Sequence, residues 1–130
     1  NLIGETRQPS DLFLCTSDDG IEWDENECQV LYTQFHDPVV VKKDNTYYLF
    51  AKLLTEGVYY GSSTDGLTWP AQEQLVRLTF YDEEGEDTSK NLDDVSAFTA
   101  PDGEIWIASN TAQEEGGPSK AIGIFRPKEM

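Results

Sequence analysis

The hydrophobic residues of this chain fall in short runs that alternate with polar positions, and Gly, Pro, Asp and Asn stand between the runs. This pattern is typical of half-buried β-strands joined by tight turns. No segment keeps the 3.6-residue apolar period of an amphipathic helix, although residues 88–95 could hold a single helical turn. The pattern predicts an all-β protein with strands near residues 11–16, 29–33, 38–43, 46–52, 57–62, 74–79, 94–99, 104–109 and 120–125.

The chain contains an internal repeat with an offset of 46 residues, because residues 12–23 align without a gap with residues 58–69. Each copy is a strand followed by Ser-x-Asp-Gly-x-x-Trp. A second self-match aligns residues 43–51 with residues 101–109. Repeats of this length with four short strands each are typical of β-propellers, whose blades are four-stranded antiparallel sheets.

The two Ser-x-Asp-Gly-x-x-Trp segments are expected to be structural turns. In each, the Asp carboxylate accepts hydrogen bonds from turn N–H groups, Gly supplies a positive φ, and Trp packs under the hairpin. These roles fall on Asp19, Gly20 and Trp23 in the first copy and on Asp65, Gly66 and Trp69 in the second.

No linker composition interrupts the chain, so we treat residues 1–130 as one propeller-type unit. It would hold a half blade at about 11–33, a blade at about 37–79 and a blade at about 94–125. A closed propeller has at least four blades, and an incomplete ring exposes strand edges and apolar faces. We therefore expect self-association, most simply as a two-fold homodimer that closes a five-bladed ring, or else a fragment of a longer protein.

Residues 35–51 begin with Phe-His-Asp-Pro and continue through a Val run to Thr-Tyr-Tyr-Leu-Phe-Ala. This stretch resembles the blade opening of glycoside hydrolase families 43 and 32. The Ser-x-Asp-Gly-x-x-Trp turns are similar to those of five-bladed glycosidases and to a shortened Asp-box of sialidases. The resemblance implies that the blade-opening Asp projects into a central channel, as general base or nucleophile in the first blade and as an orienting or pKa-tuning group in the second.

Carried over by position, the channel role falls on Asp37, while the alternative is that an Asp before Pro simply closes a turn into an edge strand. The neighbouring His36 would contact a substrate hydroxyl, line the channel or only be hydrogen-bonded. Asp93 and Asp94 occupy the corresponding opening of the next blade, where the proline is missing. Glycoside hydrolysis needs two carboxyl groups. The general-acid Glu of family 43 has no counterpart in a matching motif, because Glu104 falls at a hairpin and Glu114 and Glu115 fall in a Gly-rich loop.

Charge narrows the set of partners. The chain has 9 Lys and Arg against 25 Asp and Glu, a formal net charge of -16, which repels nucleic acid and anionic membrane surfaces. The apolar runs are far shorter than the roughly 20 residues of a membrane-spanning helix. We expect a soluble protein without nucleic-acid or membrane partners, and the sequence leaves its compartment open. The absence of Met at position 1 suggests a removed leader, a tag or a longer precursor.

The two cysteines, Cys15 and Cys28, are 13 positions apart and belong to no Cys/His cluster, so no metal site and no cofactor is predicted. Cys15 is interpreted first as a small buried hydrophobe in a strand, with a disulfide to Cys28 as the second interpretation.

The leading functional hypothesis is a carbohydrate-associated propeller protein that binds a glycan or a small polar ligand at its central channel. Two alternatives stay open. One is a glycoside hydrolase with Asp37 as general base or pKa modulator, which requires a second carboxylate at catalytic distance. The other is a non-catalytic assembly module that binds another protein, for which a channel lining without charge would argue.

Overall fold

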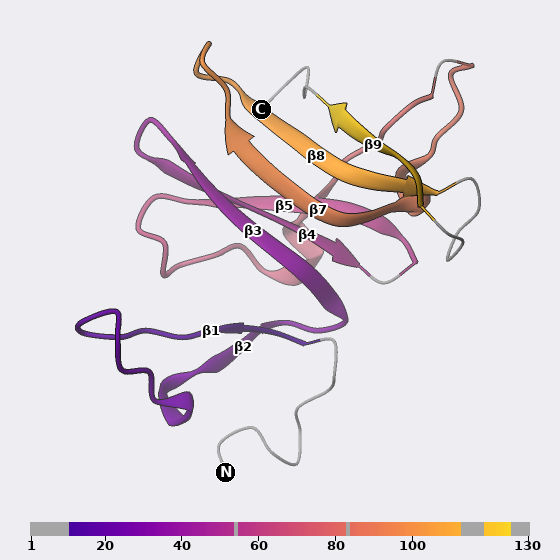
Figure 1. Ribbon diagram of the computed structural model, residues 1–130. Coiled ribbons are helices and arrows are strands. Elements are labelled where there is room, and N and C mark those ends of the chain that lie inside the picture. Colours follow the sequence, from indigo (N-terminus) through magenta and orange to yellow (C-terminus); the bar gives the residue numbers. More distant parts are fainter. Residues whose placement is uncertain (1–10, 54, 83, 113–118, 126–130) are drawn as a thin grey trace.

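The computed structural model describes residues 11–53, 55–82, 84–112 and 119–125, and this part of the chain is an all-β structure (Figure 1). Each expected strand is present within a few residues of its expected bounds. The expected helical turn is the 3₁₀ turn η3 (Ser89–Asn91), and two further 3₁₀ turns are η1 (Glu25–Glu27) and η2 (Gln72–Gln74). The strands are β1 (Leu12–Leu14), β2 (Gln29–Tyr32), β3 (Phe35–Lys43), β4 (Thr46–Leu53), β5 (Gly57–Ser63), β6 (Val76–Arg77), β7 (Leu92–Thr99), β8 (Ile105–Ala112) and β9 (Ser119–Phe125).

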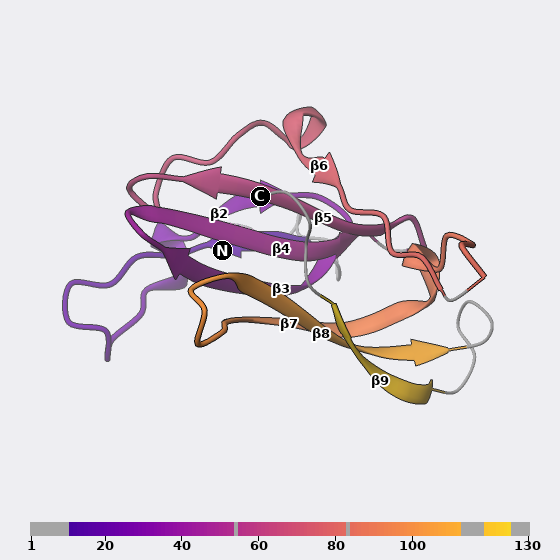
Figure 2. The same cartoon turned by 90° about the horizontal axis from the view of Figure 1, so that it is seen from above.

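The strands form three antiparallel sheets in chain order: β1-β2, β3-β4-β5-β6 and β7-β8-β9. Figure 1 shows the β1-β2 pair as a separate layer below the four-stranded sheet. Seen from above, β7-β8-β9 lies along the β3 side of that sheet (Figure 2). Because every connection within a sheet joins neighbouring strands, each sheet is a simple meander.

The four-stranded sheet packs against other strands on both faces. One core cluster fills the space between this sheet and β7-β8, and a second lies between the same sheet and β1-β2. This explains why β4 is a nearly continuous apolar run rather than an alternating one. The buried members of the first cluster are Phe50, Val58, Phe80, Leu92, Val95, Ala97, Ile105 and Ile107. Those of the second are Leu12, Tyr32, Phe35, Leu49 and Ala51.

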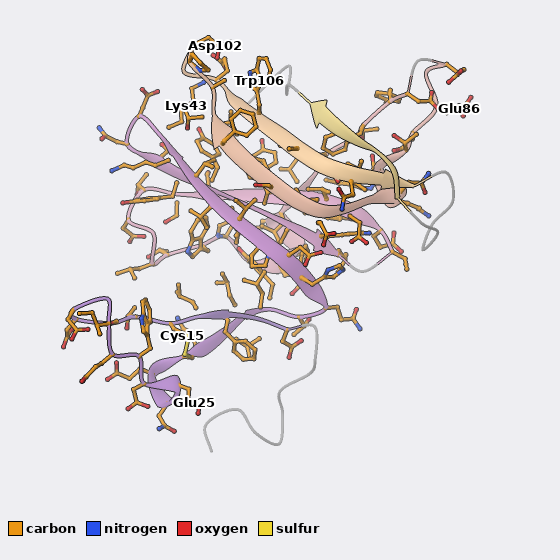
Figure 3. All side chains as sticks on the ribbon, in the orientation of Figure 1. Cys15, Glu25, Lys43, Glu86, Asp102 and Trp106 are labelled. Atoms are coloured by element: carbon orange, nitrogen blue, oxygen red, sulfur yellow. A yellow bond between two sulfur atoms is a disulfide. The ribbon has the colours of Figure 1, made fainter. Side chains whose placement is uncertain are left out.

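Two tight hairpins lie at the same end of β3 and β7. The β3-β4 turn has Asp44 at φ 54°, and the β7-β8 turn has Gly103 at φ 84°, which are conformations that Asp and Gly tolerate. An ion pair of 3.1 Å between Lys43 Nζ and Glu104 Oε2 joins the two hairpins, near the labelled Lys43 and Asp102 of Figure 3.

Cys15 and Cys28 form a disulfide, with 4.2 Å between their Cα atoms (Figure 3). The preference for Cys15 as a buried free thiol was therefore wrong. Leu14 pairs with Gln29 across the β1-β2 ladder, so Cys15 and Cys28 are the next opposed residues beyond this pair. This pairing could not be predicted from the sequence, because β2 is short and its residues do not indicate its register with β1.

The Asp carboxylates of the two Ser-x-Asp-Gly-x-x-Trp turns accept equivalent backbone hydrogen bonds. Asp19 Oδ1 accepts from the N–H groups of Ile21 and Glu22, at 2.8 and 2.9 Å. Asp65 Oδ1 accepts in the same way from Leu67 and Thr68, at 2.8 and 2.7 Å. These backbone donors stabilise the carboxylates, and they lower the pKa of both aspartates.

The two turns differ in their tryptophans. Trp69 is half-buried and packs against the core cluster beneath β1 and β2. Its counterpart Trp23 is 59% exposed, although its Nε1 donates to the carbonyl of Gly20 just as that of Trp69 does to Gly66. The prediction that the tryptophan packs under the hairpin is therefore confirmed for Trp69 and wrong for Trp23.

None of the helical turns in the described part of the chain is long or apolar enough to span a membrane.

Candidate functional site

Strands β3 and β7 both begin with a β-bulge. In the β3-β4 ladder His36 pairs with Lys52 and the next pair is Val39 with Phe50, so Asp37 lies in the bulge. In the β7-β8 ladder the corresponding pairs are Asp93 with Asn110 and Ser96 with Ala108, which places Asp94 in the bulge. Both sheets therefore open with the same interruption.

Asp37 and Asp94 have the left-handed backbone that such a bulge requires, with φ angles of 52° and 47°. For residues other than Gly this conformation is costly, and Asp and Asn tolerate it best. The bulge re-aims the side chain that follows it. The direction of these two side chains is therefore set by the backbone of the bulge as well as by their rotamers.

The two bulges bring three carboxylates together. Oxygen atoms of Asp37, Asp93 and Asp94 all lie within 4.8 Å of one another. Asp93 and Asp94 are exposed and Asp37 is half-buried. The cluster thus faces solvent beside the edge where β3 and β7 meet.

Each carboxylate of the cluster has a polar partner. Nδ1 of His36 lies 2.8 Å from Oδ2 of Asp37 and donates when it carries a proton. Asn110 donates from Nδ2 to Oδ2 of Asp94 at 2.9 Å. Together these contacts orient two of the three carboxylates.

Lys52 supplies a positive charge to the third carboxylate. Its Nζ lies 3.6 Å from Oδ1 of Asp93, and the pair bridges β4 of one sheet and β7 of the next. The lysine is only 9% exposed, so its methylene chain is packed within the protein while its ammonium reaches the cluster. It offsets part of the repulsion among the carboxylates.

The backbone of Asp93 is fixed by a buried serine. Ser109 is 3% exposed, and its hydroxyl accepts from the Asp93 N–H at 3.1 Å and donates to the Asp93 carbonyl at 2.7 Å. A bulge leaves ladder groups without their usual partners, and the serine satisfies both groups of this residue.

Sequence reasoning missed Lys52, Ser109 and Asn110. A signal was present for Lys52, because a charged residue inside the otherwise apolar β4 run is expected only where it has a partner. Ser109 and Asn110 follow the apolar start of β8, but small polar residues after an apolar run are too common to indicate a site.

The other predicted residues lie elsewhere. Glu104 pairs with Lys43 at the opposite end of β3, far from the bulge. Glu114 and Glu115 lie outside the described residues. Asp19, Gly20, Asp65 and Gly66 are in the turns that follow β1 and β5.

The cluster offers both hydrogen-bond acceptors and donors. The carboxylates accept, while Lys52, Asn110 and a protonated His36 nitrogen donate. The three aspartates could also supply three oxygen ligands to a hard cation, although Ca²⁺ takes 6–8. The arrangement is chemically suited to a ligand that carries several hydroxyl groups.

The chain matches no family model, no curated protein and no solved structure. The resemblance to glycosidase blades therefore rests on the sequence motifs.

Proposed function

We propose that the protein is a carbohydrate-associated protein with propeller-like blades, and that the cluster of Asp37, Asp93 and Asp94 binds a glycan or a small polar ligand. The observation that carries this proposal is the convergence of three carboxylates within 4.8 Å at two equivalent bulges. In this proposal each sheet is a blade or part of one, and β3 and β7 are the inner strands.

The chemistry of the cluster favours a neutral polyhydroxyl ligand. Sugar hydroxyls both donate and accept, so they can pair with carboxylates and with Lys52 and Asn110 at once. Three carboxylates lie near one lysine, and a negative charge on the ligand would add to their mutual repulsion rather than relieve it. Anionic sugars are therefore the less favoured ligands.

A glycoside hydrolase is the second candidate, and one observation supports it. Asp37 has further carboxylates nearby, as a glycosidase requires. One oxygen of each carboxylate lies within 4.8 Å of the others, a spacing nearer to the roughly 5–5.5 Å between the carboxyl groups of retaining enzymes than to the roughly 6.5–9.5 Å of inverting ones. However, these aspartates come from the contacting strands β3 and β7 and form one cluster rather than two separate, opposed groups, so we favour binding over hydrolysis.

The assembly-module alternative has less support. It would be favoured by inner strands without charge, whereas the openings of β3 and β7 carry His36, Asp37, Asp93 and Asp94.

A titration by NMR tests the proposed function. Neutral mono- and oligosaccharides are added to the ¹⁵N-labelled protein in the presence of EDTA. We expect saturable shifts of the amide signals of residues 36–37, 93–94 and 110, and at least tenfold weaker binding for Asp37→Asn and Asp94→Asn. Glu73→Gln, an exposed change in η2, is the matched control and should bind like the parent protein. Equal binding by Asp94→Asn and the parent would contradict the proposal.

The same variants separate binding from hydrolysis. A hydrolase releases the leaving group of chromogenic aryl glycosides, and Asp37→Asn should then lose turnover while it keeps its fold. Saccharide binding without such release supports the binding function.

A further inference from the structure

Lys52 reaches the carboxylate cluster through the hydrophobic core. It pairs with Val58 in the β4-β5 ladder and lies two residues after Phe50, so the three side chains share one face of the sheet. Phe50 and Val58 are fully buried in the core cluster between this sheet and β7-β8, and Lys52 is only 9% exposed. Its methylene chain is therefore packed along the core, and its ammonium emerges beside Asp93.

The ammonium of Lys52 has three N–H donors and no close acceptor. Its ion pair with Asp93 Oδ1, at 3.6 Å, is longer than the roughly 2.7–3.2 Å of an N–H···O hydrogen bond. In the described part of the chain it donates no other hydrogen bond, whereas Lys43 donates to Glu104 at 3.1 Å. A charged group that is nine-tenths buried normally has its hydrogen bonds made, so these open donors indicate an acceptor that comes from a ligand.

The ammonium is accessible to such a ligand. Among the residues that the structure describes, the fully enclosed side-chain polar atom without a hydrogen-bond partner is Nε1 of Trp106. The Lys52 ammonium, which also lacks a close acceptor, therefore reaches the surface, next to the exposed Asp93.

The position of the ammonium also decides between a metal ion and a hydroxyl ligand. Three carboxylates within 4.8 Å would attract a divalent cation if they stood alone. Lys52 already places a positive charge 3.6 Å from Asp93, and this charge repels a cation that approaches the same carboxylate. A cation also has no lone pair to offer to the open donors, whereas a hydroxyl oxygen has two.

We propose that Lys52 determines which ligand the cluster binds. Its ammonium donates to one hydroxyl oxygen of a sugar, the neighbouring hydroxyl donates to Asp93, and its charge keeps divalent cations out. Because Nζ and Oδ1 are 3.6 Å apart, one molecule contacts both through two adjacent hydroxyl groups. The inference rests on the proposed saccharide binding and names its ligand class, which is a vicinal diol bound directly and not through a metal ion.

The substitution Lys52→Met tests the donor role, because methionine keeps a similar length and an apolar stem but removes the donors and the charge. The probes are the methyl glycosides of glucose, galactose and mannose, titrated by NMR in the presence of EDTA. We expect the glycoside that binds the parent protein best to bind Lys52→Met about tenfold more weakly or worse. Lys43→Met, which removes a lysine from the ion pair with Glu104 at the other end of β3, is the matched control and should bind like the parent.

Monodeoxy analogues of that glycoside identify the hydroxyl group that Lys52 contacts. Removal of this hydroxyl should weaken binding to the parent about tenfold, because it leaves the ammonium without its acceptor. The same removal should change binding to Lys52→Met less than about twofold, because the contact is already lost. Losses that simply add in every analogue would show that Lys52 contacts no hydroxyl group, and would overturn the proposal.

A calorimetric titration with CaCl₂ tests the exclusion of cations without any saccharide. We expect Lys52→Met to bind Ca²⁺ about tenfold more tightly than the parent, and Lys52→Arg, which keeps the charge, to bind it as weakly as the parent. No difference between the parent and Lys52→Met, whether both bind Ca²⁺ or neither does, would overturn the proposal. Amide spectra of each variant check that the fold is kept.

Failure of this inference is distinct from failure of the proposed function. If no saccharide binds the parent protein, the proposed function is wrong and the donor role of Lys52 is wrong with it. If a saccharide binds the parent and Lys52→Met equally well, the binding function holds, only water occupies the donors of Lys52, and this inference alone is overturned.

Discussion

Asp37 and Asp94 occupy the same position in two neighbouring sheets, each in a left-handed conformation at the bulge near the start of β3 or β7, with φ of 52° and 47°. The same left-handed aspartate thus occurs at the bulge of both strands, and the carboxylates of both residues belong to one cluster. Backbone conformations of this kind persist where the surrounding structure enforces them, and they concentrate at functional sites.

Replacing Asp94 by glycine distinguishes the contribution of its backbone to the stability of the fold from the contribution of its carboxylate to the proposed saccharide binding. Glycine adopts a positive φ without cost, so Asp94→Gly should be more stable to urea than Asp94→Ala by about 1 kcal/mol. Both variants should lose saccharide binding. At the neighbouring Asp93, whose φ is not positive, glycine should instead be less stable than alanine. A lower midpoint for Asp94→Gly than for Asp94→Ala would show that the left-handed conformation is absent in solution.

The disulfide is expected to be a major source of stability. It closes a loop of 13 residues in sequence separation, and cross-linking such a loop is worth about 3 kcal/mol in the chain-entropy model. The double variant Cys15→Ser, Cys28→Ser should lose this amount in urea unfolding, and the reductant-treated parent protein should behave in the same way. A parent protein whose stability is the same with and without reductant would contradict the assignment.

Gly61 is the repeat counterpart of Cys15, and it has no room for a side chain. A Cβ at this position would lie 2.7 Å from Leu75 Cδ2 and 2.9 Å from Pro70 Cγ. Gly61→Ala should therefore lower the free energy of unfolding by about 1–3 kcal/mol. Ser62→Ala, at an exposed position of the same strand, should change it by less than about 0.5 kcal/mol and serves as the control.

Asp65 should make stability depend on pH. Hydrogen bonds from Thr68 and Leu67 lower the pKa of its carboxyl in the folded protein, so the charged form stabilises the fold. This contribution is complete well above the unfolded pKa of about 3.9, and it is lost as the pH falls through the folded pKa. The stability difference between the parent protein and Asp65→Asn should be constant above about pH 5 and should shrink below about pH 4.

Comparing the parent protein with Asp65→Asn cancels the effect of other carboxyl groups on the pH dependence of stability. Asp19 and Asp87 also have lowered pKa values, from their own hydrogen bonds, but both are present in the two proteins and cancel in the difference. A difference that stays constant down to pH 2 would mean that Asp65 does not hold its turn through its charge.

The strands and turns were predictable because their signals are local. Alternating apolar positions and the Ser-x-Asp-Gly-x-x-Trp turns depend on residues close in sequence, and the strands of the structure follow them. The pairing of Cys15 with Cys28 depends instead on the register of two short strands. The Asp-Pro opening drew attention to Asp37, and its counterpart Asp94 was found by alignment. Lys52 could not be assigned to Asp93 from sequence, because the two residues belong to different sheets.

The bulges have a consequence for how such a site changes over evolution. Backbone pairing fixes the geometry of each opening, and Ser109 also holds the backbone of Asp93 at the start of β7. The side chains of Asp93 and Asp94 are exposed and contribute little to the core. If the proposed binding function holds, substitutions at Asp93 or Asp94 would change ligand preference in related proteins without repacking of the sheets. The duplication of one strand-and-bulge unit would give two such positions side by side, each free to diverge.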